Sequence, residues 1–330
     1  MKIVVAGRFD YIRFAWQKKI DNGQVLYLEN GFFRKLSFQN KLKAKWESFL
    51  GKIQKKKAAD FAKKNSLREY FDIDSLKKQD EILFIIYETN FLSSDFSLLE
   101  YLKKSFPKSK FVLQYTNAIG TVRPKITKKL VENSDFFDLV YTFNRPDAEK
   151  YGYKLFVDIC SGDYSAVQEA DCNYYDVFYI GKAKNRLNTI LSVANKCLVL
   201  GLKIKFFIVD VAEEDQIQLE GVTYNHFLSY TQMLSIEKKS KSILNVMQGV
   251  SSGLTLRDEE AICMNKILIT DGNFIFNTKY YTKEKVIPLS KLENQIDKIV
   301  FSNEAINWNG ISDERGVQNF INRITKDLNI

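Results

Sequence analysis

Short, nearly continuous apolar runs that alternate with amphipathic segments constrain the fold of this chain more than any other feature. Runs such as EILFIIYE, KFVLQYT, DVFYIG and KFFIVD lack the polar alternation of half-exposed strands. Such runs are typical of parallel strands covered by helices on both faces. Strands are predicted at 2–6, 24–28, 82–87, 111–115, 138–142, 154–158, 176–180, 204–209, 222–224, 243–246, 267–270 and 286–289. Helices are predicted between them, for example at 95–105, 185–200, 230–239 and 290–300. The alternation predicts the α/β class with parallel sheets.

The predicted strands fall into two sets, divided near residues 161–173. A chain of 330 residues also exceeds what one core usually supports. We therefore expect two Rossmann-like domains facing across a cleft, with ligands outside the carboxyl ends of the strands. The expected parts are an amino-terminal domain at 1–162, a second domain at 170–312, and a terminal helix at 313–330 that packs back on the first domain.

Composition excludes several classes of protein. The chain is 45% hydrophobic, with 25 Phe and 17 Tyr, which excludes a disordered chain. No apolar run approaches the roughly 20 residues that cross a bilayer, and the start MKIVVAGRFDYIR is unlike a secretory signal. The four Cys form no CxxC pair and His226 is the single His, so no metal site is predicted. We expect a cytoplasmic protein with reduced thiols.

Positive charge is concentrated in the first half of the chain. Residues 1–150 hold 29 Lys and Arg against 18 Asp and Glu, whereas residues 151–330 hold 20 against 22. The first half is therefore expected to meet an anionic partner. Residues 41–64 carry nine Lys and an apolar helical stripe that includes Trp46. This pattern fits a helix on an anionic membrane surface, or a helix that packs on the core with a solvated lysine face.

The sharpest motif is QGVSSGLTLRDEEAICMNK at 248–266, where a Gly/Ser-rich turn follows a strand and precedes a helix. Free backbone N–H groups at such a turn can hold a diphosphate. We expect Ser252, Gly253, Leu254 and Thr255 to supply N–H or hydroxyl donors. Arg257 would add positive charge, and Glu260 would accept hydrogen bonds from sugar or ribose hydroxyls. An ordinary turn with a capping Ser is the alternative.

Two further loops follow strands of the second half. In YIGKAKNRL, Gly181 permits a tight turn and is followed by the cations Lys182, Lys184 and Arg186. These cations would bind a phosphate, or the loop would simply be solvated. The loop from Tyr224 to Tyr230 is rich in flat and amide side chains and could hold a nucleobase.

The second half resembles a known family. SGLTLRDEEAICMNKILIT is similar to the donor-site segment of bacterial GT-B glycosyltransferases of capsule and lipopolysaccharide clusters, with Glu260-Ala261 and Lys266 before a strand. FFDLVYTFNRPDAEKYGYKLF and DVFYIGKAKNRL resemble the end of the first domain and the opening of the donor domain in that group. The resemblance covers residues 130–330. It implies a nucleotide-sugar donor in the second domain, UDP favoured, and a diphosphate held without metal. Retaining members carry a Glu where this chain has Ser252, so the stereochemistry stays open.

The first half would then bind the acceptor and supply any general base. Candidate bases are carboxylates at the ends of predicted strands, namely Asp10, Glu88 and Asp95, with Glu88 best placed. Acceptor contacts are predicted at Gly7, Arg8, Thr116 and Asn117.

These features together predict a hexosyltransferase that moves a sugar from a nucleotide diphosphate to a surface glycan, either a polysaccharide or a lipid-linked acceptor. Arg257 is expected to join Glu88 and Asp10 in catalysis by stabilising the leaving diphosphate. A sugar-nucleotide 2-epimerase of the same architecture is one alternative, disfavoured by the single His. A basic nucleic-acid-binding protein is the other, but no recognised binding module supports it.

Overall fold

The computed structural model describes residues 1–28, 81–91, 97–156, 162–248, 253–302, 306–308 and 316–330. The chain forms two compact units. The first comprises Met1–Thr142, Asp147–Lys154 and Lys326–Ile330, and the second comprises Phe143–Pro146 and Leu155–Thr325. The second unit therefore begins near residue 155 and includes most of the last helix.

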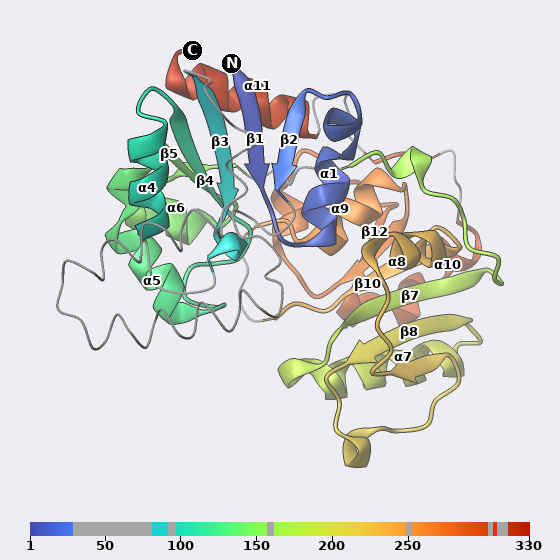
Figure 1. The fold of residues 1–330 in the computed structure, drawn as a ribbon. Coiled ribbons are helices and arrows are strands. Elements are labelled where there is room, and N and C mark those ends of the chain that lie inside the picture. Colours follow the sequence, from blue (N-terminus) through green and yellow to red (C-terminus); the bar gives the residue numbers. More distant parts are fainter. Residues whose placement is uncertain (29–80, 92–96, 157–161, 249–252, 303–305, 309–315) are drawn as a thin grey trace, which may run out of the picture. The chain divides into compact units, whose positions relative to one another are not determined.

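The first unit is built on a six-stranded sheet in the order β2-β1-β3-β4-β5-β6 (Figure 1). Strands β1 to β5 pair in parallel, and Val5 of β1 lies opposite Tyr27 of β2 and Ile85 of β3. The strand bounds are β1 Lys2–Ala6, β2 Val25–Leu28, β3 Ile82–Tyr87, β4 Lys110–Tyr115, β5 Leu139–Thr142 and β6 Lys154–Leu155. All six residues of β3 are buried, as the continuous apolar run predicts.

Helices cover this sheet. They are α1 Asp10–Asp21, α4 Ser97–Ser105, α5 Pro124–Glu132 and α6 Arg145–Tyr151. Helices α4 and α5 pack on the same face, because Leu99, Leu102 and Leu130 join Phe84 and Phe111 in one core cluster. Their outer surfaces are polar, which gives the alternation of apolar and charged residues in these segments.

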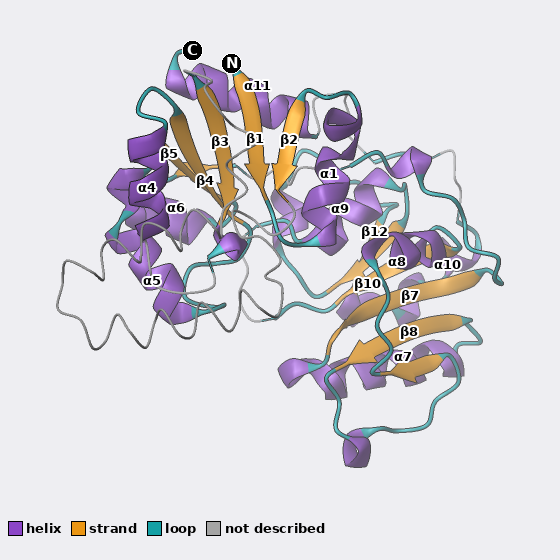
Figure 2. Ribbon diagram, viewed as in Figure 1, coloured by secondary structure: helices purple, strands orange, loops and turns teal. Residues whose placement is uncertain are grey.

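The second unit has a six-stranded parallel sheet in the order β12-β11-β10-β7-β8-β9 (Figure 2). Its strands are β7 Tyr175–Lys182, β8 Ile204–Val209, β9 Val222–Tyr224, β10 Ser240–Asn245, β11 Ile267–Thr270 and β12 Val286–Pro288. Its helices are α7 Leu187–Val199, α8 Tyr230–Glu237, α9 Leu256–Cys263, α10 Asp297–Val300 and α11 Val317–Leu328. Helix α7 packs on one face through residues such as Ile190, and α9 packs in a separate cluster through Ala261. The unit is therefore a layered α/β structure.

The predicted fold class is confirmed: two parallel sheets, each with its own helices. The long helix predicted at 290–300 is wrong. That segment forms two 3-10 turns, η8 Leu289–Lys291 and η9 Glu293–Gln295, before the short α10. The spacing of Leu292, Ile296 and Ile299 imitates a helix, yet 3-10 hydrogen bonds from Leu292 N–H and Gln295 N–H interrupt it.

The basic segment at 41–64 and the expected turn residue Ser252 lie outside the described residues. In the part of the chain that the structure describes, no helix is long and apolar enough to cross a membrane.

Candidate functional site

In each sheet the chain adds strands first on one side of its starting strand and then on the other. The boundary between these two sets of strands is the reversal point of the sheet. In the first sheet it lies between β1 and β3, and in the second between β7 and β10. In open α/β sheets, ligands bind in the crevice outside the carboxyl ends of the strands at such a point. The residues that follow these four strands are therefore the candidates for a functional site.

In the second unit, the loops after β7 and β10 are joined at this point. The Arg186 guanidinium donates to the carbonyl oxygen of Val246, and also to that of Lys182 at 2.6 Å. The Lys184 ammonium donates to the Gln248 side chain. The structure thus brings the predicted cationic loop next to the start of the predicted Gly/Ser-rich turn.

The cations of this loop crowd one another. Burial lowers the pKa of Lys184, and the charges of Arg186 and Lys182 lower it further. Lys182 is the one of these three that forms an ion pair among the described residues, with Asp210 at 2.9 Å. A site that gathers positive charges in this way favours an anionic ligand.

A buried tyrosine lies beneath the same loop. Tyr179 is 3% exposed, and its hydroxyl has no hydrogen-bond partner within the described ranges; the Arg186 Nε also lacks one. A Cβ atom on Gly181 would lie 2.8 Å from the Tyr179 hydroxyl, so glycine is required there. We did not predict Tyr179 from the sequence. Its position two residues before Gly181, on the same face of the strand, is the signal that could have found it.

The predicted turn into α9 is held by a polar cluster. The Thr255 side chain caps the helix by accepting from the Asp258 N–H, and the Asp258 carboxylate accepts from the Thr255 N–H at 2.7 Å. Asn245, at the end of β10, donates to both side chains, at 3.0 and 2.8 Å. Leu254 is buried, and a Cβ on Gly253 would lie 2.6 Å from the Phe143 ring. The turn is therefore fixed to the end of the sheet.

Arg257 and Glu260 contact each other. The Arg257 guanidinium pairs with the Glu260 carboxylate and lies 3.6 Å from that of Glu237. The Tyr230 hydroxyl donates to Glu260 at 2.8 Å and lies 3.3 Å from the Tyr164 hydroxyl. Three predicted donor-site residues, Arg257, Glu260 and Tyr230, are thus brought together, while Glu237 and Tyr164 were missed.

This cluster is buried. The side chains of Glu237 and Glu260 have no exposed surface, whereas the Arg257 side chain is 19% exposed. Burial raises the pKa of Glu260 to about 7, although the charge of Arg257 acts to lower it. Burial and the charge of Glu260 also raise the pKa of Glu237. Two carboxylates therefore share one guanidinium.

The third predicted loop is divided between two places. Tyr224 ends β9 at the sheet edge, and its hydroxyl donates to the Ile217 carbonyl at 2.7 Å. His226 is exposed and lies beside the Phe207 ring, with 5.8 Å between ring centroids. Tyr224 is therefore not joined to the cluster that holds Tyr230.

In the first unit, Glu88, Thr116 and Asn117 form one hydrogen-bonded group, as expected for residues that follow adjacent parallel strands. The Glu88 carboxylate accepts from the Thr116 N–H and hydroxyl, both at 2.9 Å, and from the Asn117 amide at 2.7 Å. The Tyr11 hydroxyl donates to the Thr116 hydroxyl at 3.2 Å. Burial raises the pKa of Glu88. This carboxylate thus already accepts three hydrogen bonds from its neighbours.

The other predicted residues of the first unit follow β1. Gly7 is buried, whereas Arg8 and Asp10 are exposed, and Asp10 begins α1. Asp95 lies outside the described residues. Asp10 is thus the exposed carboxylate at this strand end.

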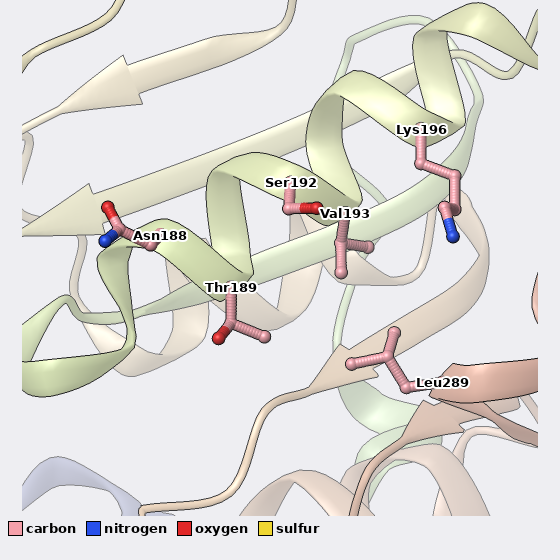
Figure 3. Close-up of a pocket in the computed structure, with 6 residues that line it drawn as sticks. All are labelled: Asn188, Thr189, Ser192, Val193, Lys196 and Leu289. Carbon is pink, nitrogen blue, oxygen red and sulfur yellow. The ribbon is translucent and has the colours of Figure 1, made fainter.

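Over the described ranges, no group of three or more His, Cys, Asp or Glu is arranged to hold a metal ion. A hollow of about 350 Å³ runs along α7, where Lys196 also pairs with Glu293 at 2.9 Å (Figure 3). Its lining residues are Asn188, Thr189, Ser192, Val193, Lys196 and Leu289. None of them belongs to the strand-end clusters.

Comparison with known proteins shows which solved structures share this architecture. No family model matches the chain, and no curated protein matches it. Among solved structures, it is similar to trehalose-6-phosphate synthase OtsA, with a TM-score of 0.56 and 10% identity over 92% of both chains. It is also similar to an E. coli structure described as trehalose-6-phosphate bound with UDP-2-fluoro glucose. The TM-score is 0.53 and the sequence identity is 12%, over 92% of both chains. A UDP-forming α,α-trehalose-phosphate synthase from Burkholderia vietnamiensis is similar with a TM-score of 0.52 and a sequence identity of 9%, over 100% of both chains. These neighbours are GT-B glycosyltransferases, and the chain therefore has the GT-B fold.

Proposed function

We propose that this protein is a glycosyltransferase of the capsule and lipopolysaccharide group, which moves a hexose from a nucleotide-diphosphate sugar to a surface glycan. The donor would bind at the carboxyl ends of β7 and β10. One observation carries the proposal: Arg186 joins the cationic loop after β7 to the end of β10 at the reversal point of the sheet. That is where an α/β sheet binds its ligand, and the cations suit a diphosphate.

In this proposal, Lys182, Lys184 and Arg186 neutralise the leaving diphosphate, together with N–H groups at Gly253, Leu254 and Thr255. No metal is required for this charge balance. The direct contacts predicted for Arg257 with the diphosphate and for Glu260 with ribose remain predictions. UDP is the favoured nucleotide, which agrees with the UDP-2-fluoro glucose bound in one similar structure.

The first unit would bind the acceptor. Asp10 is the best candidate for the general base, because it is exposed and begins α1, just after the loop that follows β1. Glu88 accepts three hydrogen bonds already and suits the role of a positioning group for Thr116 and Asn117.

The acceptor is proposed to be a polysaccharide or a lipid-linked glycan, with the protein bound peripherally on the inner face of the membrane. Exposed lysines on α4 and α5, namely Lys103, Lys104, Lys125, Lys128 and Lys129, add to the positive charge of the first half. Co-sedimentation with phosphatidylglycerol vesicles at low salt, lost at high salt, is the expected result. No co-sedimentation would remove the membrane from the proposal.

Calorimetry with UDP, GDP and CDP tests the donor site. We expect UDP to bind, and Arg186→Ala to weaken binding by about tenfold or more through loss of a charge-assisted contact. Arg123→Ala, in the first unit, is the control that should leave binding unchanged. Absence of nucleotide binding would overturn the proposal. Isomerisation of the donor sugar without any acceptor would instead indicate a 2-epimerase.

A further inference from the structure

One face of helix α7 borders an open hollow in the second unit. Thr189, Val193 and Lys196 are spaced i, i+4 and i+7, so they lie on one face of this helix. Val193 is 5% exposed and belongs to a core cluster of the unit, whereas Thr189 is exposed. These side chains and Leu289 line the hollow of about 350 Å³ (Figure 3). The hollow therefore has its base on the core and opens to solvent.

The wall opposite α7 is held in place by contacts within the same unit. Leu289 begins η8 and packs against the core cluster that includes Val193. Glu293, the first residue of η9, pairs with the Lys196 ammonium at 2.9 Å. Apolar packing and an ion pair thus join the two walls. The hollow is therefore formed before any ligand binds, as is usual for small-molecule sites.

Three residues of α7 offer hydrogen bonds to a ligand in the hollow. Asn188 carries an amide, while Thr189 and Ser192 carry hydroxyls, and each of these groups both donates and accepts. All three residues are exposed, so a ligand can reach them. The side chains of Val193 and Leu289 add only apolar atoms. The hollow thus offers hydroxyl and amide groups together with an apolar surface.

The charge of the hollow is balanced. Among the described residues that line it, Lys196 is the only charged one, and Glu293 compensates its ammonium. The loop after β7 differs, because Lys182, Lys184 and Arg186 gather positive charge there. An anion would therefore gain less in the hollow than at that loop, and a neutral ligand is favoured.

Size and chemistry together identify the class of ligand. Small-molecule pockets usually measure about 300–1,000 Å³, so a hollow of about 350 Å³ suits a ligand about as large as one sugar ring. A sugar ring also has the matching groups, because its hydroxyls both donate and accept and its C–H groups can contact apolar side chains. A neutral sugar brings no charge that the hollow would leave unpaired.

We infer that the hollow on α7 is a binding site for one unit of a neutral saccharide. Asn188, Thr189 and Ser192 bind its hydroxyls, while Val193 and Leu289 contact its C–H groups. None of these residues belongs to the strand-end clusters where the donor sugar is proposed to bind. The saccharide is therefore a separate ligand, and the inference goes beyond the proposed function. Because the hollow is open, this unit can be part of a longer glycan chain.

Two substitutions in the full chain test this site, Thr189→Val and Ser192→Ala, each of which removes a hydroxyl. Neither should lower the melting temperature, because both residues are exposed and Ala is the best helix former. The probes are glucose, galactose, N-acetylglucosamine and lactose, with inorganic phosphate as the anionic comparison. Binding is followed by NMR of methyl-labelled protein, because Val193 and Leu289 carry methyl groups that line the hollow.

The matched control is Asn195→Ala, since Asn195 is an exposed polar residue of α7 that does not line the hollow. At least one neutral saccharide should shift the methyl signals of Val193 and Leu289 in the wild type. Thr189→Val and Ser192→Ala should each weaken this binding by about two- to tenfold, the effect of losing one neutral hydrogen bond. Asn195→Ala should bind saccharide as the wild type does. Salt at about 0.5 M should not weaken the binding, since a neutral ligand has no charge to screen.

Three results would overturn the inference: no neutral saccharide shifts these methyl signals, Thr189→Val and Ser192→Ala both bind saccharide as the wild type does, or the ligand that binds is phosphate. UDP affinity should be unchanged in both variants. Weaker UDP binding in Ser192→Ala would also overturn the inference, because the hollow would then belong to the donor site. Failure of the wild type to bind UDP would count against the proposed function and leave the saccharide site intact.

Discussion

Arg257 carries a charge that two buried carboxylates share. Glu237 and Glu260 have no exposed surface, and Arg257 is the cation that pairs with both of them within the described ranges. Removing a cation from such a group leaves buried negative charge without compensation, which is costly even where the intact group adds little stability.

At pH 8, above the pKa of about 7 that Glu260 has in the folded protein, we therefore expect Arg257→Ala to lower the free energy of unfolding by about 3–5 kcal/mol. Denaturation in urea measures this loss. Lys182→Ala serves as control, because its ion pair with Asp210 is mostly exposed and such pairs contribute about 0–1 kcal/mol. Equal stability of the two variants would contradict the view that Arg257 compensates buried charge.

The same cluster predicts how stability depends on pH. Burial raises the pKa of Glu260 to about 7, so between pH 4.5 and 7 the folded protein holds a proton that the unfolded chain releases. Stability should therefore fall as pH rises through this window. Glu260→Gln should make the fall shallower, as measured by urea denaturation at a series of pH values.

Glu132→Gln is the control for this pH series. Glu132 is exposed on α5, and its hydrogen bond with Lys129 lowers the pKa of its carboxyl, so its contribution changes only below about pH 4.5. A slope between pH 4.5 and 7 that is the same in wild type and Glu260→Gln would show that Glu260 does not titrate there.

At the scale of elements, two helices of the second unit begin with the same device. In α8 the Ser229 side chain and Gln232 form a capping box, and in α9 Thr255 and Asp258 do so. The first is exposed, whereas the second is bound to Asn245 at the end of β10. Comparing the two caps therefore distinguishes two effects. Both caps stabilise a helix, but only the cap of α9 can also position the turn before the helix, through its contact with Asn245.

Thr255→Ala and Ser229→Ala should each cost about 1 kcal/mol of stability, the usual effect of losing an N-cap. Only Thr255→Ala should also weaken UDP binding, because it frees the turn at Gly253 and Leu254. Thr255→Ser should restore both properties. Calorimetry on the three variants checks this, and equal UDP affinity in all of them would contradict a positioning role for the cap.

Burial decides which elements the sequence could predict. The strands were found because both faces of each are covered, which leaves a continuous apolar run such as Ile82–Tyr87. The grouping of Glu88 with Thr116 and Asn117 followed from the rule that adjacent parallel strands end at the same sheet edge. Glu237 and Tyr164 were missed. Their contacts with Arg257 and Tyr230 join elements that are distant along the chain, so they leave no local pattern.

At the scale of the whole molecule, each of the two units has its own sheet and its own buried clusters, and the nucleotide site is proposed in the second unit. A ligand that binds the folded state stabilises the part of the protein that holds it, by about 2.7 kcal/mol at a hundred times its Kd. Because each unit has its own sheet and core, the two can unfold in separate steps.

We expect UDP to raise the melting temperature of the second unit and to leave that of the first unchanged. Calorimetry measures the melting temperature of each unfolding step, and hydrogen exchange shows which unit unfolds in that step. EDTA should alter neither the shift nor the proposed transferase activity, since in the proposed site cations of the chain would balance the diphosphate. Complete loss on chelation, restored by Mg²⁺ or Mn²⁺, would require a metal site.

Residues 326–330 belong to the first unit, where Asp327 accepts a hydrogen bond from the Tyr141 hydroxyl at 2.8 Å. A ribosome makes the strands of the first unit early but supplies residues 326–330 only after the entire second unit. The domain that starts first during synthesis is therefore finished last. During translation the first unit is complete only after residues 326–330 have been synthesised. Premature termination before Lys326 would therefore leave the first unit without its last segment, although nearly all of the second unit had been made.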